Sequence, residues 1–211
     1  MVRHLSGGYM PKIVDEQMRE ATRQRILREA ASEFARLGFD QANINVIAEQ
    51  AGIGKGTIYL YFENKRELFL AMLRQIAQSQ LAVIRPALAT PGTLQERLEK
   101  LFRAFVTLAQ TDSDSFNVYM SALYGVNRAF QAEATRLLRD YLAVISLVLE
   151  EESSTSALQI ENVETASLMV LSLTESYILS AKVLGQSEQR LIQQAPLVAR
   201  AILQGIGTPQ Q

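Results

Sequence analysis

Apolar residues recur every three or four positions along most of the chain, which is the spacing of amphipathic α-helices. In the first of these segments Ile26, Ala30, Phe34 and Leu37 fall on one helical face, and Gly38 follows as a stop signal. Patterns that favour strands are scarce. We therefore expect an all-α protein of about nine helices and no strands. The expected helices cover residues 16–37, 44–51, 54–62, 64–84, 93–110, 113–124, 127–152, 160–184 and 188–204.

Residues that cap or break helices separate these segments. Asn43 and Asn64 stand at helix starts, and Thr93 with Glu96 forms a capping-box pattern. Pro86 is expected to close the fourth helix, because proline cannot donate the next helical hydrogen bond. The remaining signals are Asp112 or Ser113 and Asn127 as caps, the serine-rich loop Ser153–Ser156, the break at Gly185, and Pro196, which should kink the last helix or begin it.

The composition is that of an ordinary globular protein with a limited chemical repertoire. Of the 211 residues 48% are hydrophobic and 20% are charged, so the chain can bury a core. There is no cysteine, and the only histidine is His4, within a tail expected at residues 1–15. We therefore expect no disulfide, no metal site, no cofactor and no cysteine or histidine catalysis. The run Glu150–Glu152 is typical of a solvated helix end rather than a catalytic pair, so we expect no enzyme.

The sequence also bears on location. The start MVRHLSGGYMPK, in which Met1 and Met10 both fit as a first residue, lacks the apolar region of a signal peptide. The most apolar stretch, Ala166 to Ala181, is too short and too polar to span a bilayer. We expect a cytoplasmic protein without a membrane partner. Ten Lys/Arg against eight Asp/Glu in residues 1–66, and eleven against fourteen in the rest, are consistent with a nucleic-acid-facing N-terminal end.

The run IAEQAGIGKGTIYLYFENKRELF, from Ile47 to Phe69, places three glycines within five positions. Its glycine spacing fits neither a dinucleotide fingerprint nor a P-loop, and a helix rather than a strand precedes it. It does fit a helix-turn-helix, in which two short helices meet through a tight turn that often contains glycine. Gly52 is at that turn, and the motif covers about residues 43–62.

Winding residues 54–62 as a helix separates a core face from an outer face. Ile58 and Phe62 lie on one side, with Ile47 and Ile53 completing a small core. The outer side presents residues suited to a DNA major groove: a lysine, a glycine that permits close approach, a threonine, a tyrosine and a leucine. These residues are Lys55, Gly56, Thr57, Tyr59 and Leu60, and Tyr61 and Lys65 flank them in positions suited to phosphate contacts.

The segment from about residue 20 to 80 resembles the DNA-binding domain of the TetR (tetracycline repressor) family of transcriptional regulators. The resemblance is carried by Phe34, Gly38, Ile47-Ala48, Ala51-Gly52, Lys55-Gly56-Thr57-Ile58-Tyr59, Tyr61-Phe62, Lys65 and Leu68-Phe69. It implies an all-helical homodimer with a divergent C-terminal ligand-binding domain. It also implies repression of nearby genes until a small molecule releases the protein. The corresponding domains are 1–15 as a tail, 16–80 for DNA binding, and 81–211 for ligand binding and dimerisation.

Three positions depart from the family pattern. Gly54 stands where the family usually has a serine that caps the recognition helix, so this cap is weaker. Asn43 replaces a common threonine and still caps, whereas Asn45 stands where an arginine sometimes reads a base. Asn45 either bonds adenine or makes no base contact, so base preference does not transfer. Tyr61 is either a DNA contact or half-buried packing.

The C-terminal two-thirds of the chain contains aromatic stripes at helical spacing, which indicate either plain core or, as the resemblance implies, an apolar pocket. Glu175 interrupts an apolar run and either meets a cationic ligand beside aromatic rings or forms an interface ion pair or an exposed helical turn, the reading we prefer. The candidate ligand-binding residues are Phe102, Phe105, Phe116, Tyr119, Met120, Tyr124, Glu175 and Tyr177.

The last two expected helices carry more apolar residues than one chain should need to cover, which favours a four-helix dimer interface. The alternative is packing within one chain. The candidate interface residues are Ala166, Val170, Leu173, Ala181, Leu191, Ala195, Val198 and Ile202.

The sequence thus predicts a DNA-binding regulator that docks as a dimer on a near-palindromic operator and is released by an unidentified small apolar or amphipathic ligand. The family resemblance implies the mechanism, in which a swing of the helix at residues 64–84 changes the spacing of the two reading heads. The alternatives are control by a protein partner and sequence-neutral architectural DNA binding. The operator, the regulated genes, the effector, and repression as against activation do not follow from the residues.

Overall fold

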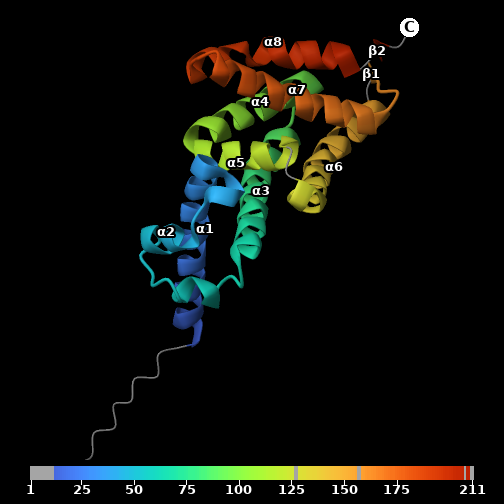
Figure 1. Cartoon of the computed structure of the whole chain (residues 1–211). Helices are drawn as coiled ribbons and strands as arrows, with labels where there is room; N and C mark the ends of the chain where they lie inside the picture. Colours follow the sequence, from blue (N-terminus) through green and yellow to red (C-terminus); the bar gives the residue numbers. More distant parts are fainter. Residues whose placement is uncertain (1–11, 126–127, 156–157, 207, 210–211) are drawn as a thin grey trace, which may run out of the picture. The chain divides into compact units, whose positions relative to one another are not determined.

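The computed structural model describes residues 12–125, 128–155, 158–206 and 208–209. This part of the chain is almost entirely helical (Figure 1). Its α-helices are α1 (Lys12–Gln41), α2 (Ile44–Gln50), α3 (Lys65–Ala89), α4 (Leu94–Thr111), α5 (Ser113–Tyr124), α6 (Gln131–Thr155), α7 (Val163–Val183) and α8 (Glu188–Ile206). Two 3₁₀ helices, η1 (Thr57–Leu60) and η2 (Arg128–Phe130), and two strands, β1 (Leu158–Gln159) and β2 (Thr208–Pro209), complete it. The predicted all-α class is confirmed.

The chain divides into two compact units, Met1–Met72 and Leu73–Gln211. The division falls inside α3, the helix that also contains the boundary expected at residue 80. His4 and the glycines of the expected tail lie outside the described residues, whereas α1 already begins at Lys12. No helix among the described residues is long and apolar enough to cross a membrane.

The N-terminal unit is built on α1, α2, η1 and the first turns of α3. The helical part of α1 ends where Gly38 adopts a φ of 71°, as its position in the sequence predicted. Beyond it, the rings of Phe34, Phe39 and Phe69 pack together, and the Phe34 and Phe69 centroids lie 4.9 Å apart in an edge-to-face arrangement. This cluster joins the end of α1 to the start of α3.

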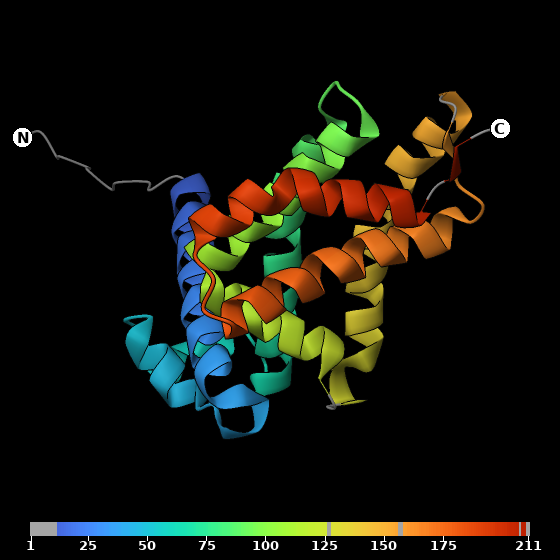
Figure 2. The ribbon, with the colours of Figure 1, turned by 90° about the horizontal axis from the view of Figure 1, so that it is seen from above.

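The C-terminal unit is a helical bundle. Helices α4 and α8 lie side by side, and α6 packs against α7 (Figures 1 and 2). The Thr93–Glu96 capping box and the Asp112 cap form as predicted, and Asn162 caps α7. The buried aromatic rings gather between α4, α5 and α6, where Tyr119 lies 5.3 Å and Phe105 lies 6.5 Å from the ring of Tyr141.

Two expected helix ends are wrong, and both helices are longer than predicted. Helix α3 continues through Pro86 to Ala89. Proline inside a helix costs about 3 kcal/mol, but the residues around it are held by burial of Ile84 and Leu88, and burying one such side chain contributes about 1.5–3 kcal/mol. Helix α6 runs through Ser153 to Thr155, because the hydroxyls of Ser154 and Thr155 donate to the Glu151 carbonyl instead of pulling the backbone into a loop.

Helix α8 begins at Glu188 and contains Pro196, so the alternative start at Pro196 is wrong. The expectation of no strands is also wrong. Strands β1 and β2 pair antiparallel, with Leu158 opposite Pro209 and Gln159 opposite Thr208. Two residues are too few to show a period of two in the sequence. Asn127, the expected cap of the sixth long helix, lies outside the described residues.

Candidate DNA interface and candidate effector site

The tight turn of the predicted helix-turn-helix is present in the N-terminal unit. Asn43 caps α2, its side chain accepting from the Asn45 amide at 2.9 Å. After α2, Gly52 has a φ of 66°, which favours glycine, and the Ile53 amide donates to the Ala48 carbonyl at 3.0 Å. Gly52 therefore turns the chain away from α2, as its position predicted.

The recognition segment that follows is shorter than predicted. Only Thr57–Leu60 is helical, as the 3₁₀ helix η1, rather than the whole of residues 54–62. Its first turn is closed by a bond from the Thr57 amide to the Gly54 carbonyl, and no side chain caps it. Glycines on both sides of Lys55 raise the entropic cost of helix formation, and the missing cap leaves amides unpaired. These two effects explain the short element.

The two faces of this segment separate as predicted. Ile58 and Phe62 are buried, whereas Leu60 and Tyr59 are 74% and 51% exposed. Lys55 and Gly56 are also exposed, as is Asn45, and Thr57 is half-buried. A Cβ placed on Gly56 would meet no heavy atom within 4 Å, so the glycine is not required by packing inside the chain. The exposed run formed by Lys55, Gly56, Tyr59 and Leu60 is the reading surface in the following text.

Tyr61 and Lys65, the expected phosphate contacts, have partners inside the chain. The Lys65 ammonium donates to the Asp40 carbonyl at 2.9 Å and lies 5.0 Å from the centroid of the Phe39 ring. Tyr61 is half-buried, and the guanidinium carbon of Arg19 lies 5.9 Å from its ring centroid. Both residues therefore contribute to packing, and their contact with DNA stays a prediction.

Three arginines of α1 support this surface and were not singled out from the sequence. Arg19 and Arg23 stack over Tyr61 and Phe62, and Arg25 donates to the Ala51 carbonyl at 2.6 Å, which satisfies the end of α2. The signal was available, because Arg19 and Arg23 are four residues apart and share a helical face.

The predicted ligand-binding residues of the C-terminal unit are distributed over several clusters. Phe102 packs edge-to-face with Tyr177 at 5.7 Å, and the Lys182 ammonium lies 5.4 Å from the Phe116 ring. Phe105, Phe116, Tyr119 and Met120 are buried. Tyr119, Tyr124 and Glu175 gather with Tyr141, and these four residues are the polar centre in the following text.

Glu175 lies in a different environment from the one preferred on sequence grounds. It is 1% exposed on α7, so the expected exposed turn is wrong, and its Oε2 accepts a 2.5 Å hydrogen bond from the Tyr124 hydroxyl. Burial raises the pKa of this carboxyl to about 7, against the smaller opposing effect of the Tyr124 bond. The burial of Glu175 could not be predicted from the apolar run around it, because a carboxylate within such a run is equally consistent with an exposed helical turn.

The tyrosines of the polar centre remain protonated. Burial is the main reason that the pKa values of Tyr119, Tyr124 and Tyr141 are raised, and the nearby Glu175 adds to each. The Tyr141 hydroxyl donates to the Oε1 of Gln80 on α3 at 2.6 Å, a bond buried between α6 and α3. The polar centre thus reaches from α7 to α3.

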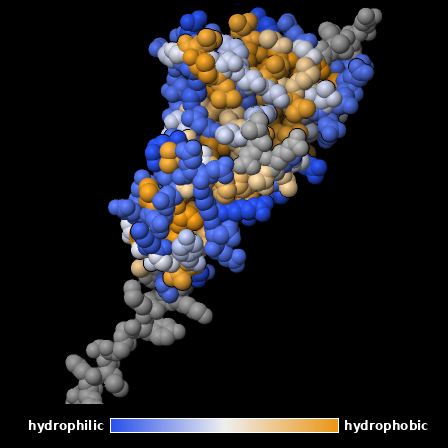
Figure 3. All heavy atoms as spheres, in the orientation of Figure 1, coloured by the Kyte–Doolittle hydropathy of each residue, from blue (hydrophilic) through white to orange (hydrophobic). Residues whose placement is uncertain are grey.

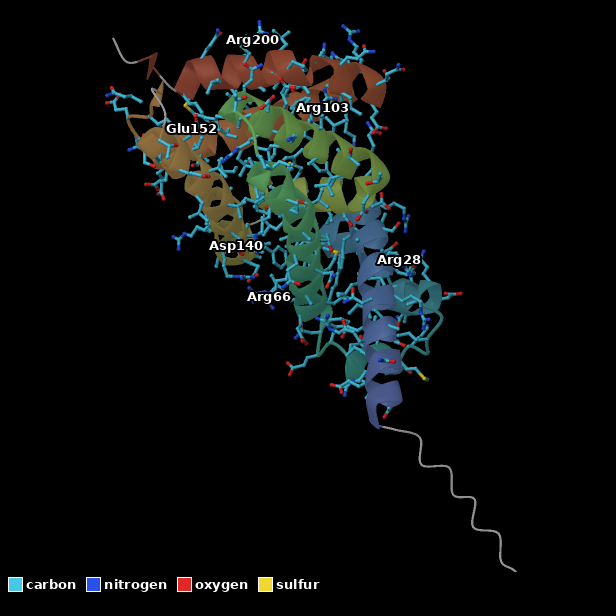
Figure 4. The ribbon with its side chains drawn as sticks, turned by 180° about the vertical axis from the view of Figure 1, so that it is seen from behind. Arg28, Arg66, Arg103, Asp140, Glu152 and Arg200 are labelled. Atoms are coloured by element: carbon cyan, nitrogen blue, oxygen red, sulfur yellow. The ribbon has the colours of Figure 1, made fainter. Side chains whose placement is uncertain are left out.

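A separate open groove of about 580 Å³ lies between the end of α3, the start of α4 and α6. Its floor includes Leu88 and Val148, and Asp140 is on its α6 side (Figure 4). The charged groups at its rim are partly paired, since Arg97 and Glu151 form a 2.9 Å ion pair. The groove is a second candidate for an amphipathic ligand, whereas the polar centre is the more buried site.

The apolar stripes of α7 and α8 that were expected to form a dimer interface pack within one chain. Seven of the eight residues are buried, and only Leu173 is exposed. The exposed large apolar side chains of these helices are instead Leu168, Met169, Leu173, Val183 and Leu197. Figure 3 shows hydrophobic residues at the surface over this part of the chain, and Figure 4 shows where Arg103 lies on α4 and Arg200 on α8.

Comparison with known proteins places the N-terminal unit. Residues 26–72 match the model for bacterial regulatory proteins of the tetR family. The chain is 25% identical over 127 residues to the fatty acid metabolism regulator protein of Bacillus subtilis, which covers 60% of this chain and 66% of that protein. It is 46% identical over 56 residues to the transcriptional repressor SCO4008 of Streptomyces coelicolor, covering 26% of this chain and 29% of the repressor. Both matches span less than two thirds of the relative.

The whole fold also has a solved counterpart. The transcriptional regulator FadR from Bacillus subtilis, in complex with stearoyl-CoA, superposes with a TM-score of 0.74 over 87% of this chain and 98% of that one, at 20% identity. This likeness establishes the fold of both units. Residues 26–72, with their exposed reading surface, thus match the tetR family of bacterial regulatory proteins, within a chain that has the fold of this solved structure.

Proposed function

We propose that the chain is a sequence-specific DNA-binding transcriptional repressor that acts in the cytoplasm. The single observation that carries this proposal is the reading surface. A lysine, a glycine open to solvent, a tyrosine and a leucine stand together directly after the Gly52 turn, in the segment that matches the family model. Side chains of this kind read base edges in the major groove, and the backbone at Gly56 can approach closely.

We further propose that two copies bind together on a near-palindromic operator. One short recognition segment reads too few bases for useful specificity, so two reading surfaces are needed. The apolar side chains exposed on α7 and α8 supply a contact surface for the second copy. This surface is tested by replacing two of its residues: the double variant Leu173→Glu, Leu197→Glu should sediment as a monomer where wild type sediments as a dimer.

The control of DNA binding is proposed to come from a small apolar or amphipathic ligand in the C-terminal unit. The same fold in Bacillus subtilis FadR holds stearoyl-CoA. In this chain α3 is one continuous helix from Lys65 to Ala89, with residues in both units, and its Gln80 bonds to the polar centre. A ligand that rearranges the polar centre therefore acts directly on the helix that leaves the DNA-binding unit, which can change the spacing of the two reading heads.

The proposal is tested by fluorescence anisotropy of labelled DNA from upstream of the protein's own gene, with excess nonspecific DNA as competitor. Wild type is compared with Thr57→Ala and Tyr61→Ala, and with Thr107→Ala on α4 as a distant control. Salt-sensitive binding that survives the competitor and is lost in the first two variants supports a specific regulator. If this DNA does not bind, selection from genomic fragments provides the operator.

Three outcomes contradict the proposal. Binding that the competitor removes, with all variants equal to wild type, favours an architectural DNA binder. A transcript from the operator promoter that falls in a deletion strain indicates activation rather than repression. Specific binding that no small molecule in a metabolite extract weakens, but that a protein fraction does, favours control by a protein partner.

A further inference from the structure

Among the described residues, two buried polar atoms of the polar centre form no hydrogen bond of standard geometry. The Oε2 of Glu175 accepts from Tyr124, but its Oε1 is buried and unpaired within the described part of the chain. The Tyr119 hydroxyl is also buried; it interacts with the Tyr141 side chain but forms no hydrogen bond of standard geometry within the described residues. Buried polar atoms in native proteins are nearly always paired, so two such atoms in one cluster indicate a site that a further group completes.

The charge of the missing group follows from what surrounds Glu175. Tyr119 and Tyr124 on α5 and Tyr141 on α6 face it, and all three are neutral. Among the residues whose side chains are described, no lysine or arginine forms an ion pair with Glu175. A buried carboxylate is strongly favoured by a cation, whereas a second anion would add like-charge repulsion.

We propose that Glu175, Tyr119 and Tyr124 bind the protonated nitrogen of an amphipathic organic amine, and that this amine is the effector. The inference rests on the proposed function, because it names the chemical class of the molecule that controls DNA binding. An ammonium group donates up to three hydrogen bonds, which suits the Glu175 Oε1 and the Tyr119 hydroxyl. The rings of the tyrosines present negative faces to a cation.

The polar centre lies one side chain below the surface. Tyr124 is 55% exposed, yet its hydroxyl reaches the carboxylate of Glu175, a residue that is 1% exposed. Tyr124 is therefore the side chain that links the surface to the buried Glu175 carboxylate. The hydroxyl of Tyr124 can either keep its bond to Oε2 or yield it to the ligand.

Because Glu175 can bind a proton, the affinity for the amine depends on pH. Burial holds its pKa at about 7, and a bound ammonium favours the ionised form. Binding of an amine therefore releases a proton and becomes tighter as the pH rises through about 7, while the facing tyrosines stay neutral throughout.

The test uses three probes that share one alkyl chain and differ in the head group: decylamine, decanol and decanoate. Their binding to the full-length protein is measured by calorimetry below their micelle concentrations and without DNA. Variants are Glu175→Gln and Tyr119→Phe, with Glu164→Gln as the control, an exposed acid on the same helix. Circular dichroism confirms that each variant is folded.

Wild type is expected to bind decylamine about tenfold or more tightly than decanol, and decanoate most weakly. Glu175→Gln should lower the affinity for decylamine to about that for decanol, and Tyr119→Phe should weaken decylamine binding more than decanol binding. Preference for decanol or decanoate, survival of the amine preference in Glu175→Gln, or no binding of any probe overturns the inference. Because no DNA is present, these results are independent of whether the operator experiment succeeds; release of operator DNA by decylamine then tests the regulatory role.

Discussion

The hydroxyl of Tyr141 on α6 and the side-chain carbonyl of Gln80 on α3 are joined by a 2.6 Å hydrogen bond that is buried from solvent. Removing one partner leaves the other buried and unpaired, which costs about 1–3 kcal/mol. Tyr141→Phe and Gln80→Leu should therefore each lower the free energy of unfolding of the protein by that amount.

The double variant should be less destabilised than the sum of the two, with a coupling of about 1 kcal/mol or more in a denaturation cycle. Additive effects would mean that the bond contributes nothing specific. In the operator assay the same variants should bind decylamine but release DNA less completely, since the connection of the polar centre to α3 is broken.

Two glycines of the helix-turn-helix have different roles, Gly56 in DNA binding and Gly52 in the backbone turn, and alanine substitutions distinguish these roles. Gly56 has an ordinary backbone conformation with open space at the Cβ position, so Gly56→Ala should leave thermal stability unchanged and weaken operator binding about tenfold or more. Gly52 has a φ of 66°, so Gly52→Ala should lower the free energy of unfolding by about 1 kcal/mol or more.

The stability of Gly52→Ala and Gly56→Ala is measured by thermal denaturation, and their operator binding by fluorescence anisotropy. Equal loss of stability in both variants would show that Gly56 is needed for folding and would remove it from the reading surface.

Glu175 should make the protein less stable as the pH rises. Its pKa is raised to about 7 by burial, from an ordinary value of 4.5, so the folded state holds a proton that the unfolded state releases. The stabilisation is complete below pH 4.5 and is lost as the pH rises to about 7, a change of about 3 kcal/mol. Glu175→Gln should abolish this loss, so the variant is more stable than wild type at about pH 8 and similar to it at about pH 4.

The measurement is urea denaturation at several pH values, with Glu164→Gln as the control. Parallel curves for wild type and Glu175→Gln would contradict the prediction, since they would mean that the carboxyl ionises as freely in the folded protein as in the unfolded chain.

Glu133 should have the opposite effect from Glu175: it should make the protein less stable as the pH falls into the acidic range. Hydrogen bonds from Arg74 on α3 are the main cause that lowers its pKa to about 2, and Arg136 adds to the effect. Its contribution to stability is complete above pH 4.5 and is lost as the pH falls towards about 2. Glu133→Gln should cost about 1–3 kcal/mol at neutral pH and nothing at about pH 2. Glu99→Gln, a half-buried acid on α4, is the control.

The elements that the sequence predicted best are those set by local side chains. Asn43, Thr93 and Asp112 cap helices through bonds to amides two or three residues away, and Gly38, Gly52 and Gly185 end helices with positive φ values. Such signals need no knowledge of the rest of the fold. The reading surface was predicted for the same reason, because its faces follow from helical spacing alone.

The incorrect expectations depend on distant contacts. Pro86 does not end α3, because Leu88 beyond it is buried by the bundle. The stripes of α7 and α8 pack against each other and α4, so the residues predicted for the dimer interface, Leu173 excepted, are buried within one chain. The polar centre could be predicted only in part. Tyr119, Tyr124 and Glu175 were candidates, but Tyr141 and Gln80 come from helices whose neighbours only the tertiary structure defines.

The pairing of the short strands β1 and β2 closes a loop of the chain that contains α7 and α8. They pair residues that flank α7 and α8, so this pair of helices is fastened at both ends, by the Gly185 turn at one and by backbone hydrogen bonds at the other. A helix normally frays from its free end. Here α8 is followed by β2, which is hydrogen-bonded to β1. The helix that carries Leu197 is therefore restrained at its C-terminal end within a single chain.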